Sequence, residues 1–144
     1  MNKDLKNNIA TCFMMLPATT TATATTNLAD LQGFESAAFL VQYGTLTNAD
    51  AGDYFTAKLQ ESDSVVGTTF TDVAAADLIG AFTDTTATTA NIQRVGYIGK
   101  KRYVRVVITE TADTNNITGI ISVVALLANA RHQVASDVAP TTAT

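Results

Sequence analysis

The segment from Asn91 to Arg105 constrains the fold most, because it has the pattern of two strands joined by a short basic turn. The turn falls at Gly99–Lys101, so we expect the two strands to pair as a hairpin. An alternating segment at Asp53–Ser62 precedes it, and an apolar segment at Ile117–Leu127 follows it. Together these segments predict an all-β protein with an antiparallel β-sandwich.

The alternation of apolar and polar residues also predicts which side chains face the core. In a half-buried strand, every second residue lies on the same face of the sheet. Two segments have predicted inward sets: Phe55, Ala57 and Leu59, and Val104, Val106 and Ile108. In a third segment, Ser36–Tyr43, one face carries Phe39, Val41 and Tyr43, and the other carries Ala38, Leu40 and Gln42.

Length, composition and charge narrow the possible functions. A chain of 144 residues is the size of one domain and needs no disulfide, and its single cysteine, Cys12, cannot form one internally. The formal net charge of −4 disfavours nucleic-acid binding, which depends on a basic surface. The absence of an apolar run of about 18 residues argues against a membrane-spanning helix. Charged residues make up 15% of the chain, which favours a surface that associates with other proteins.

The ends of the chain differ from its middle. We expect an N-terminal arm at residues 1–17, a β-sandwich domain at 18–130 and a C-terminal tail at 131–144, and the tail's composition predicts mobility. The arm carries an apolar cluster with no local packing partner, made of Phe13, Met14, Met15 and Leu16. Either this cluster folds back onto its own sandwich, or it docks on a partner subunit.

The last predicted strand is apolar on both faces. Ile121, Val123, Ala125 and Leu127 share one face, and Ile120, Val124 and Leu126 share the other. Because an antiparallel sheet usually exposes one face to water, the second apolar face requires a cover. Two covers are compatible with the sequence: a loop or the arm of the same chain, or a second subunit. The set Ile120, Val124 and Leu126 is therefore the candidate self-association face.

The sequence does not contain a recognisable catalytic or metal site, and we expect neither enzymatic activity nor a cofactor. His132 is the one histidine, and no nucleophile-elbow motif accompanies it. Asn48, Asp50 and Asp53 could offer oxygen ligands to calcium, but ordinary turn chemistry accounts for the same residues.

The concentrated positive charge of the chain lies at the predicted hairpin. It comprises Lys100, Lys101, Arg102 and Arg105. One interpretation is a solvated hairpin tip, and the other is a docking site for an acidic protein surface. Nucleic acid is a lesser alternative, because stacking aromatics near the patch are limited to Tyr97 and Tyr103.

Four segments carry a resemblance to a known family. They are Asp30–Gly44, Lys58–Asp63, Phe70–Gly80 and, as the most specific, Val95–Val106. In these segments the chain resembles the cementing, or decoration, proteins encoded beside the major capsid gene of tailed double-stranded-DNA bacteriophages. The resemblance extends over roughly Asp30 to His132.

This resemblance implies a jelly-roll β-sandwich that is made in the host cytoplasm and sits on the outer surface of the virion's icosahedral head. Its partners would be the major capsid lattice and itself, as a homodimer or else a trimer, without nucleic acid or membrane. The candidate capsid contacts are Phe13, Met14, Met15, Leu16, Lys100, Lys101, Arg102 and Arg105. A receptor- or carbohydrate-binding β-sandwich is the alternative function, for which Tyr43 and Tyr54 would be the binding aromatics.

Overall fold

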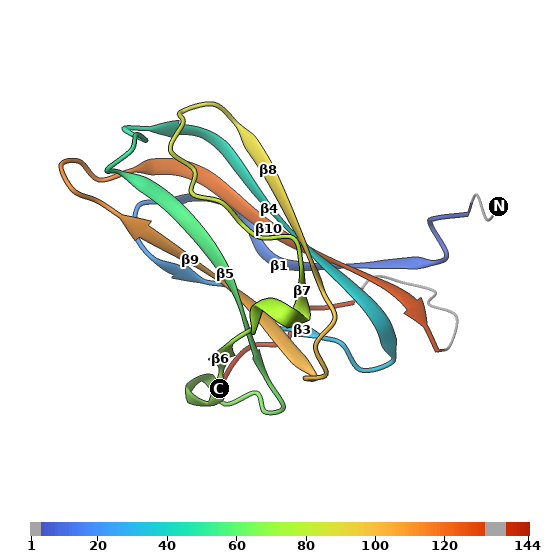
Figure 1. The fold of residues 1–144 in the computed structure, drawn as a ribbon. Coiled ribbons are helices and arrows are strands. Elements are labelled where there is room, and N and C mark those ends of the chain that lie inside the picture. The colour runs from blue at the N-terminus through green and yellow to red at the C-terminus, as the bar shows by residue number, and fades with distance from the viewer. Residues whose placement is uncertain (1–3, 132–137) are drawn as a thin grey trace.

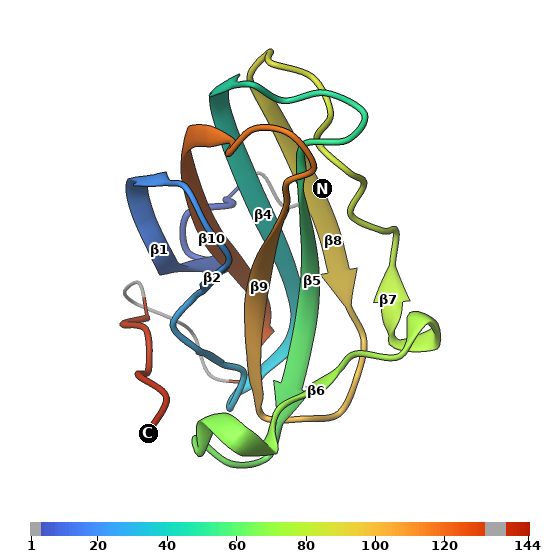
Figure 2. The same ribbon diagram turned by 90° about the vertical axis from the view of Figure 1, so that its left-hand side faces the viewer.

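Two antiparallel sheets pack face to face in the computed structural model, which describes residues 4–131 and 138–144 (Figures 1 and 2). Sheet A has the order β1-β10-β4-β8-β7, with bounds Ile9–Thr20, Thr118–Ala130, Phe34–Thr47, Asn91–Tyr97 and Leu78–Ile79. Sheet B has the order β2-β9-β5-β6, with bounds Ala24–Thr25, Tyr103–Thr111, Tyr54–Ser62 and Thr71–Asp72, and β3 (Ala29–Asp30) also pairs with β9. Two 3-10 turns lie at Gly67–Thr69 and Ala75–Asp77.

The strand order is that of a jelly roll. The strands β1, β10, β4 and β8 of sheet A face β2, β9, β5 and β6 of sheet B. The chain passes between the two sheets after β1, β3, β4, β6, β8 and β9. Two interlocked Greek keys of eight strands produce this arrangement. The fold class predicted from the sequence is therefore confirmed.

The core lies between the sheets and is built by the predicted alternation. The inward residues of β5 and β9 are those that the alternation predicted, and β4 buries the set Phe39, Val41 and Tyr43; none of these residues is more than 9% exposed. β10 contributes Ile121, Val123, Ala125 and Leu127, all at 0% exposure. Burial of these side chains provides the main stabilisation of the sandwich, at roughly 1.5–3 kcal/mol for each large one.

The predicted hairpin at Asn91–Arg105 is wrong. β8 pairs with β4 and β7 in sheet A, whereas β9 pairs with β5 in sheet B. The connection at residues 98–102 therefore crosses from one sheet to the other. Packed sheets lie about 10 Å apart, a gap that five extended residues can span. Alternation assigned both strands correctly, but it carries no information on whether they share a sheet.

The predicted arm at residues 1–17 is also wrong over most of its length, because Ile9–Thr20 forms strand β1. This strand pairs with β10 from Ile9 to Thr20 and buries Ala10, Cys12 and Met14. Sheet A thus begins well before the predicted boundary at residue 18. Residues 4–8 form an exposed turn that lies away from the body of the sandwich (Figure 1).

The described part of the tail, residues 138–144, packs on its own domain, which corrects the prediction of a mobile tail for that part. Thr141 and Leu28 exchange backbone hydrogen bonds of 3.0 and 2.7 Å. At the end of the chain, Thr144 bonds with the backbone of Val65 and Gly67. Ala143 packs against a small cluster of Leu28, Phe70 and Tyr103 beside sheet B. Figure 2 shows this segment next to the connection between β2 and β3.

Truncating the chain after residue 137 should lower its stability, because the deletion leaves the backbone groups of Leu28 and Val65 unpaired and uncovers Leu28. Net hydrogen-bond values of about 0.5–1.5 kcal/mol each, reduced by the entropy of ordering the tail, predict a loss of about 1–3 kcal/mol. Urea unfolding measures it, with Thr142→Ala, at an exposed tail position, as the control. An unchanged midpoint would show that the tail does not stabilise the domain.

Candidate interaction surfaces

The outer face of sheet A carries many apolar side chains that are brought together by cross-strand pairs, with Gln42 and Ser122 as a polar pair among them. Phe13 of β1 lies opposite Val124 of β10, which in turn lies opposite Leu40 of β4. The next outward row places Leu126 opposite Ala38. We call the following set the apolar face: Phe13, Leu40, Ile79, Ile92, Ile120, Val124 and Leu126.

Several of these side chains are unusually exposed for their type. The exposed fractions are 53% for Phe13, 55% for Ile120, 59% for Ile92 and 62% for Ile79. Val124, Leu126 and Leu40 are half-buried by their neighbours within the face. The register also places Arg94 beside Leu40, so one cation stands among the apolar side chains. A large group of exposed apolar side chains rimmed by polar residues is typical of a protein–protein contact.

The predicted self-association face is thus part of an outer surface that no described segment of the chain covers. Ile120, Val124 and Leu126 lie on the outer side of β10, while the alternate residues of the same strand are in the core. The N-terminal strand does not cover the face but lies beside it and adds Phe13. Sequence reasoning assigned Phe13 and Ile120 to different surfaces, and the register of β1 on β10 unites them.

The apolar cluster predicted at residues 13–16 is divided between the two sides of sheet A. Met14 is 1% exposed and belongs to the core, and Met15 is partly buried against it. Leu16 is 68% exposed. The pairing of β1 with β10 shifts between Phe13 and Met15 and again before Ala18. Each irregularity turns neighbouring side chains to unexpected faces, as β-bulges do, so the cluster is not one contact site.

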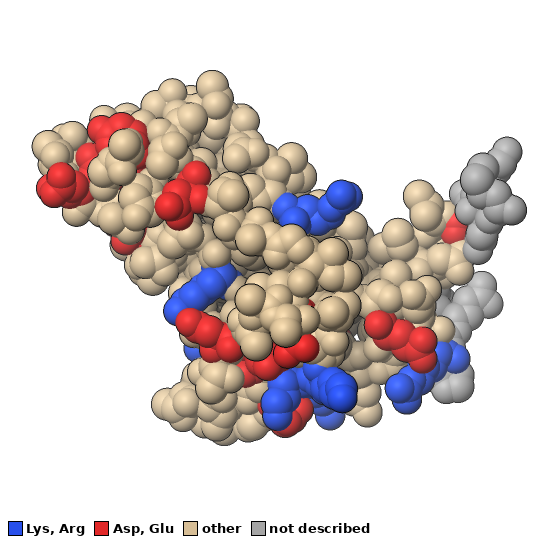
Figure 3. All heavy atoms as spheres, viewed as in Figure 1, with Lys and Arg blue, Asp and Glu red and all other residues tan. Residues whose placement is uncertain are grey.

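The basic residues likewise do not form one cationic patch. Lys101 forms an ion pair with Asp63, and Arg102 holds Asp30 by two hydrogen bonds of 2.9 and 2.7 Å. Arg105 lies on sheet B, where it bonds Gln60 and stacks over Phe70. Figure 3 shows cations and carboxylates side by side at the lower end of the molecule. Three of the four predicted cations therefore have partners within the chain.

These pairings affect the ionisation of their members. The hydrogen bond from Lys101 lowers the pKa of Asp63 below its ordinary value, and the same contact raises the pKa of Lys101. Partial burial raises the pKa of Asp30, but the bonds from Arg102 and the Gln32 backbone outweigh it, so its pKa is lowered. Both carboxylates therefore stay charged at neutral pH.

The turn with candidate calcium ligands is held by its own backbone. The Asp53 carboxylate accepts N–H bonds of 2.5–3.1 Å from Asp113, Thr114 and Asn115. Asp50 accepts bonds from the N–H groups of Gly52 and Asp53. Within residues 4–131 and 138–144, no three His, Cys, Asp or Glu side chains are grouped to hold a metal ion. Asp53 ties the β4–β5 loop to the β9–β10 loop, a role that its position in the sequence did not indicate.

The aromatic residues invoked for the carbohydrate-binding alternative do not form an open platform. Tyr43 is 2% exposed, and burial raises the pKa of its hydroxyl to about 12. Tyr54 is half-buried. His132 lies outside the described residues, and no helix in the described part of the chain is long and apolar enough to cross a membrane.

Comparisons with known proteins give a distant likeness to solved structures. No family model matches the chain, and no curated protein matches it. Among solved structures, the chain is similar to one titled "Structure of infectious bursal disease virus Gx strain", with 10% sequence identity and a TM-score of 0.46. The match covers 92% of this chain and 37% of that one, so the chain spans little more than a third of its neighbour's length.

Two adjacent isoleucines on β10 allow a matched test of the two faces. Ile121→Ala removes a fully buried side chain and should cost about 2–5 kcal/mol of unfolding free energy. Ile120→Ala, at an exposed position, should cost less than about 1 kcal/mol. Urea unfolding at several protein concentrations measures both and separates monomer from oligomer stability. Equal losses at high dilution would mean that Ile120 is a core residue.

Asp53 should make stability depend on pH. Burial alone would raise its pKa, but the three backbone bonds outweigh burial, so its pKa in the folded chain is lowered. A carboxyl group of this kind stabilises the fold above its unfolded pKa of about 3.9 and loses that contribution as pH falls further. The stability difference between the wild type and Asp53→Asn should therefore be larger at pH 7 than at pH 3, as measured by urea unfolding. A difference that does not change with pH would contradict this role.

Proposed function

We propose that this chain is a structural virion protein that binds the outer surface of an icosahedral phage head and bridges its major capsid subunits. In this role it stabilises the shell against the outward pressure of the packaged DNA. The mechanism is non-enzymatic and requires no cofactor. The resemblance in Asp30–Gly44 and Val95–Val106 supports this assignment.

The observation that carries the proposal is the apolar face. The core between the two sheets does not include the outward side chains of Phe13, Ile79, Ile92 and Ile120, so they do not contribute to its burial. Burying such side chains yields about 25 cal/mol for each square ångström of apolar surface removed from water. We assign this face to a second copy of the chain, because two apolar sheets pack well against each other.

Pairing of copies makes bridging possible. If each copy of a dimer holds one shell subunit, the dimer joins two subunits. A ligand that binds only the assembled lattice stabilises that lattice by mass action, and two linked contacts bind more tightly than either alone. Many copies on one head would together raise the temperature at which the shell ruptures.

The proposal is tested with heads of the encoding phage assembled without this protein. Light scattering after size exclusion should give a dimer for the wild type and a monomer for the double variant Phe13→Asp with Ile120→Asp. Wild-type protein should co-sediment with heads and raise their rupture temperature, whereas the double variant should bind more weakly and give little increase. Val66→Asp, at a 43%-exposed apolar residue away from the apolar face, is the matched control.

Two outcomes would contradict the proposal. Wild-type protein that does not sediment with heads would refute the virion role and leave the receptor- or carbohydrate-binding alternative to be tested on glycans. A double variant that protects heads as well as the wild type would remove the apolar face from the mechanism.

A further inference from the structure

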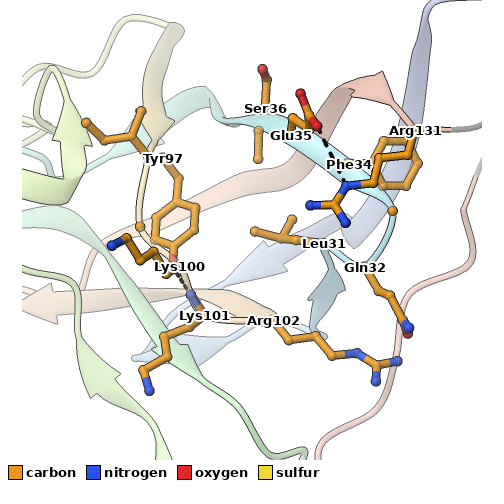
Figure 4. Close-up of a pocket in the computed structure, with 14 residues that line it drawn as sticks. Leu31, Gln32, Phe34, Glu35, Ser36, Tyr97, Lys100, Lys101, Arg102 and Arg131 are labelled. Atoms are coloured by element: carbon orange, nitrogen blue, oxygen red, sulfur yellow. Dashed lines mark hydrogen bonds and ion pairs between the residues drawn. The ribbon is translucent and has the colours of Figure 1, made fainter.

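A pocket of about 620 Å³ lies at the end of the sandwich opposite the Asp53 loops (Figure 4). One wall is the turn that leads into β4, from Leu31 to Ala37. The other wall is the crossing connection from Tyr97 to Arg102, and Arg131 at the end of β10 completes the rim. None of the lining residues belongs to the apolar face, whereas the ion-paired Lys101 and Arg102 do line the pocket.

The walls are fixed by the chain's own hydrogen bonds. The Leu31 N–H donates to the Arg102 carbonyl at 2.8 Å and joins the two walls, and the Arg131 N–H donates to the Gly33 carbonyl at 2.9 Å. The Tyr97 hydroxyl accepts a bond from the Lys101 backbone and donates to Glu61 at 2.5 Å. A cavity whose walls are already ordered loses little entropy when it binds a ligand.

Glycine is required at two points of these walls. Gly33 adopts a φ of +91°, which L side chains rarely do. At Gly99, an added Cβ would lie 2.4 Å from the Tyr97 hydroxyl oxygen, so the connection can approach the ring this closely only without a side chain. The shape of the pocket is therefore encoded by specific residues.

The pocket combines an apolar floor with a cationic rim. Leu31, Phe34 and Ala37 are partly buried against the core and line the pocket together with Tyr97. In Figure 4 the Arg131 guanidinium projects over Leu31, facing Glu35. The Arg131–Glu35 contact is 3.6 Å long, with side chains 72% and 60% exposed, so it is a weak ion pair that a better acceptor can displace.

The charges around the rim favour an anionic partner group. Lys101 and Arg102 are already neutralised by Asp63 and Asp30. Lys100 is exposed, and among the described residues the Arg131 guanidinium has only the long contact with Glu35. A ligand carboxylate can accept hydrogen bonds from the Arg131 guanidinium with both of its oxygens, a bidentate geometry that Glu35 does not reach.

We propose that this pocket binds an extended peptide segment of a partner protein, with an apolar side chain on Leu31 and Phe34 and a neighbouring carboxylate on Arg131 and Lys100. A peptide fits better than a nucleic acid, since the ion pairs of Lys101 and Arg102 leave Lys100 and Arg131 as the rim cations for a ligand, few for a phosphate backbone. The proposal rests on the proposed function in one respect: the protein that carries the bound segment would be the shell subunit.

The test uses synthetic pentapeptides of the form acetyl-Gly-X-Z-X-Gly-amide, with X as Leu or Phe and Z as Glu or Gln. Titrated into the ¹⁵N-labelled full chain, the Glu peptides should shift the amide signals of Gly33, Gly99 and Lys100. The Gln peptides should bind at least about fivefold more weakly, the loss of one charge-assisted hydrogen bond. In Arg131→Gln that preference should disappear.

Glu35→Gln is the most discriminating variant, because the two roles of Glu35 predict opposite changes in peptide affinity. Removing this carboxylate frees Arg131, so the Glu peptides should bind more tightly, whereas a merely structural contribution of Glu35 would weaken binding. Lys6→Gln, at an exposed cation outside the pocket, is the control and should leave the affinity unchanged. Absence of shifts at the pocket, or equal binding of the Glu and Gln peptides, would overturn the proposal.

Binding to phage heads tests separately whether the shell subunit carries the bound segment. If Arg131→Gln loses the preference for Glu peptides and also binds heads more weakly, the result would support the shell subunit as the source of the segment. Wild-type protein that binds the Glu peptides but not heads would refute the proposed function while leaving the pocket's chemistry intact. Wild-type protein that binds heads but no peptide would refute the pocket proposal alone.

Discussion

The pairing of β10 with both β1 and β4 is the interaction on which the rest of the structure depends. β10 is bonded along its length on both edges, and its inward side chains from Ile121 to Leu127 are fully buried. Because side chains alternate along a strand, the same backbone that fixes the core also fixes the outward row of Ile120, Val124 and Leu126. The apolar face is therefore as rigid as the core behind it, and a contact made through it requires little ordering.

The sequence predicted the fold wherever local period decides the outcome. Alternation predicted the inward residues of β5 and β9 and divided those of β4 and β10 into the two faces that the structure has, and the resemblance implied the jelly roll. The sequence did not predict which strands pair with each other. β8 and β9 are separated by five residues and look like a hairpin, yet they bury apolar residues from opposite sheets. The choice between a hairpin and a crossing depends on long-range packing, which a local pattern does not contain.

The candidate sites were predictable to a similar extent. The outward row on β10 was visible as a second apolar period, but its extension to Phe13 and Ile79 required the register of distant strands. The basic cluster looked like one patch because its members are adjacent in sequence. Their aspartate partners, Asp30 and Asp63, lie far away along the chain and become neighbours only in the fold. The pocket beside them has no sequence signature beyond its glycines, because its walls come from three separate segments.

These features give the molecule two different contact regions. The apolar face lies on the broad side of sheet A, and the pocket lies at one end of the sandwich, with an apolar floor and a cationic rim. We propose a different partner for each region: a second copy across the face, and a peptide segment of the shell in the pocket. A subunit with two independent contacts can join neighbouring shell subunits, whereas a subunit with one contact can only bind to the shell surface.

Electron cryo-microscopy of heads saturated with this chain tests the account most directly. The account predicts ordered density outside the shell, with copies paired across Phe13 and Ile120 and a segment of shell subunit in the pocket beside Arg131. Copies that bind the shell singly, with the face of Phe13 and Ile120 open to solvent, would contradict it, as would heads that carry no ordered density for the chain.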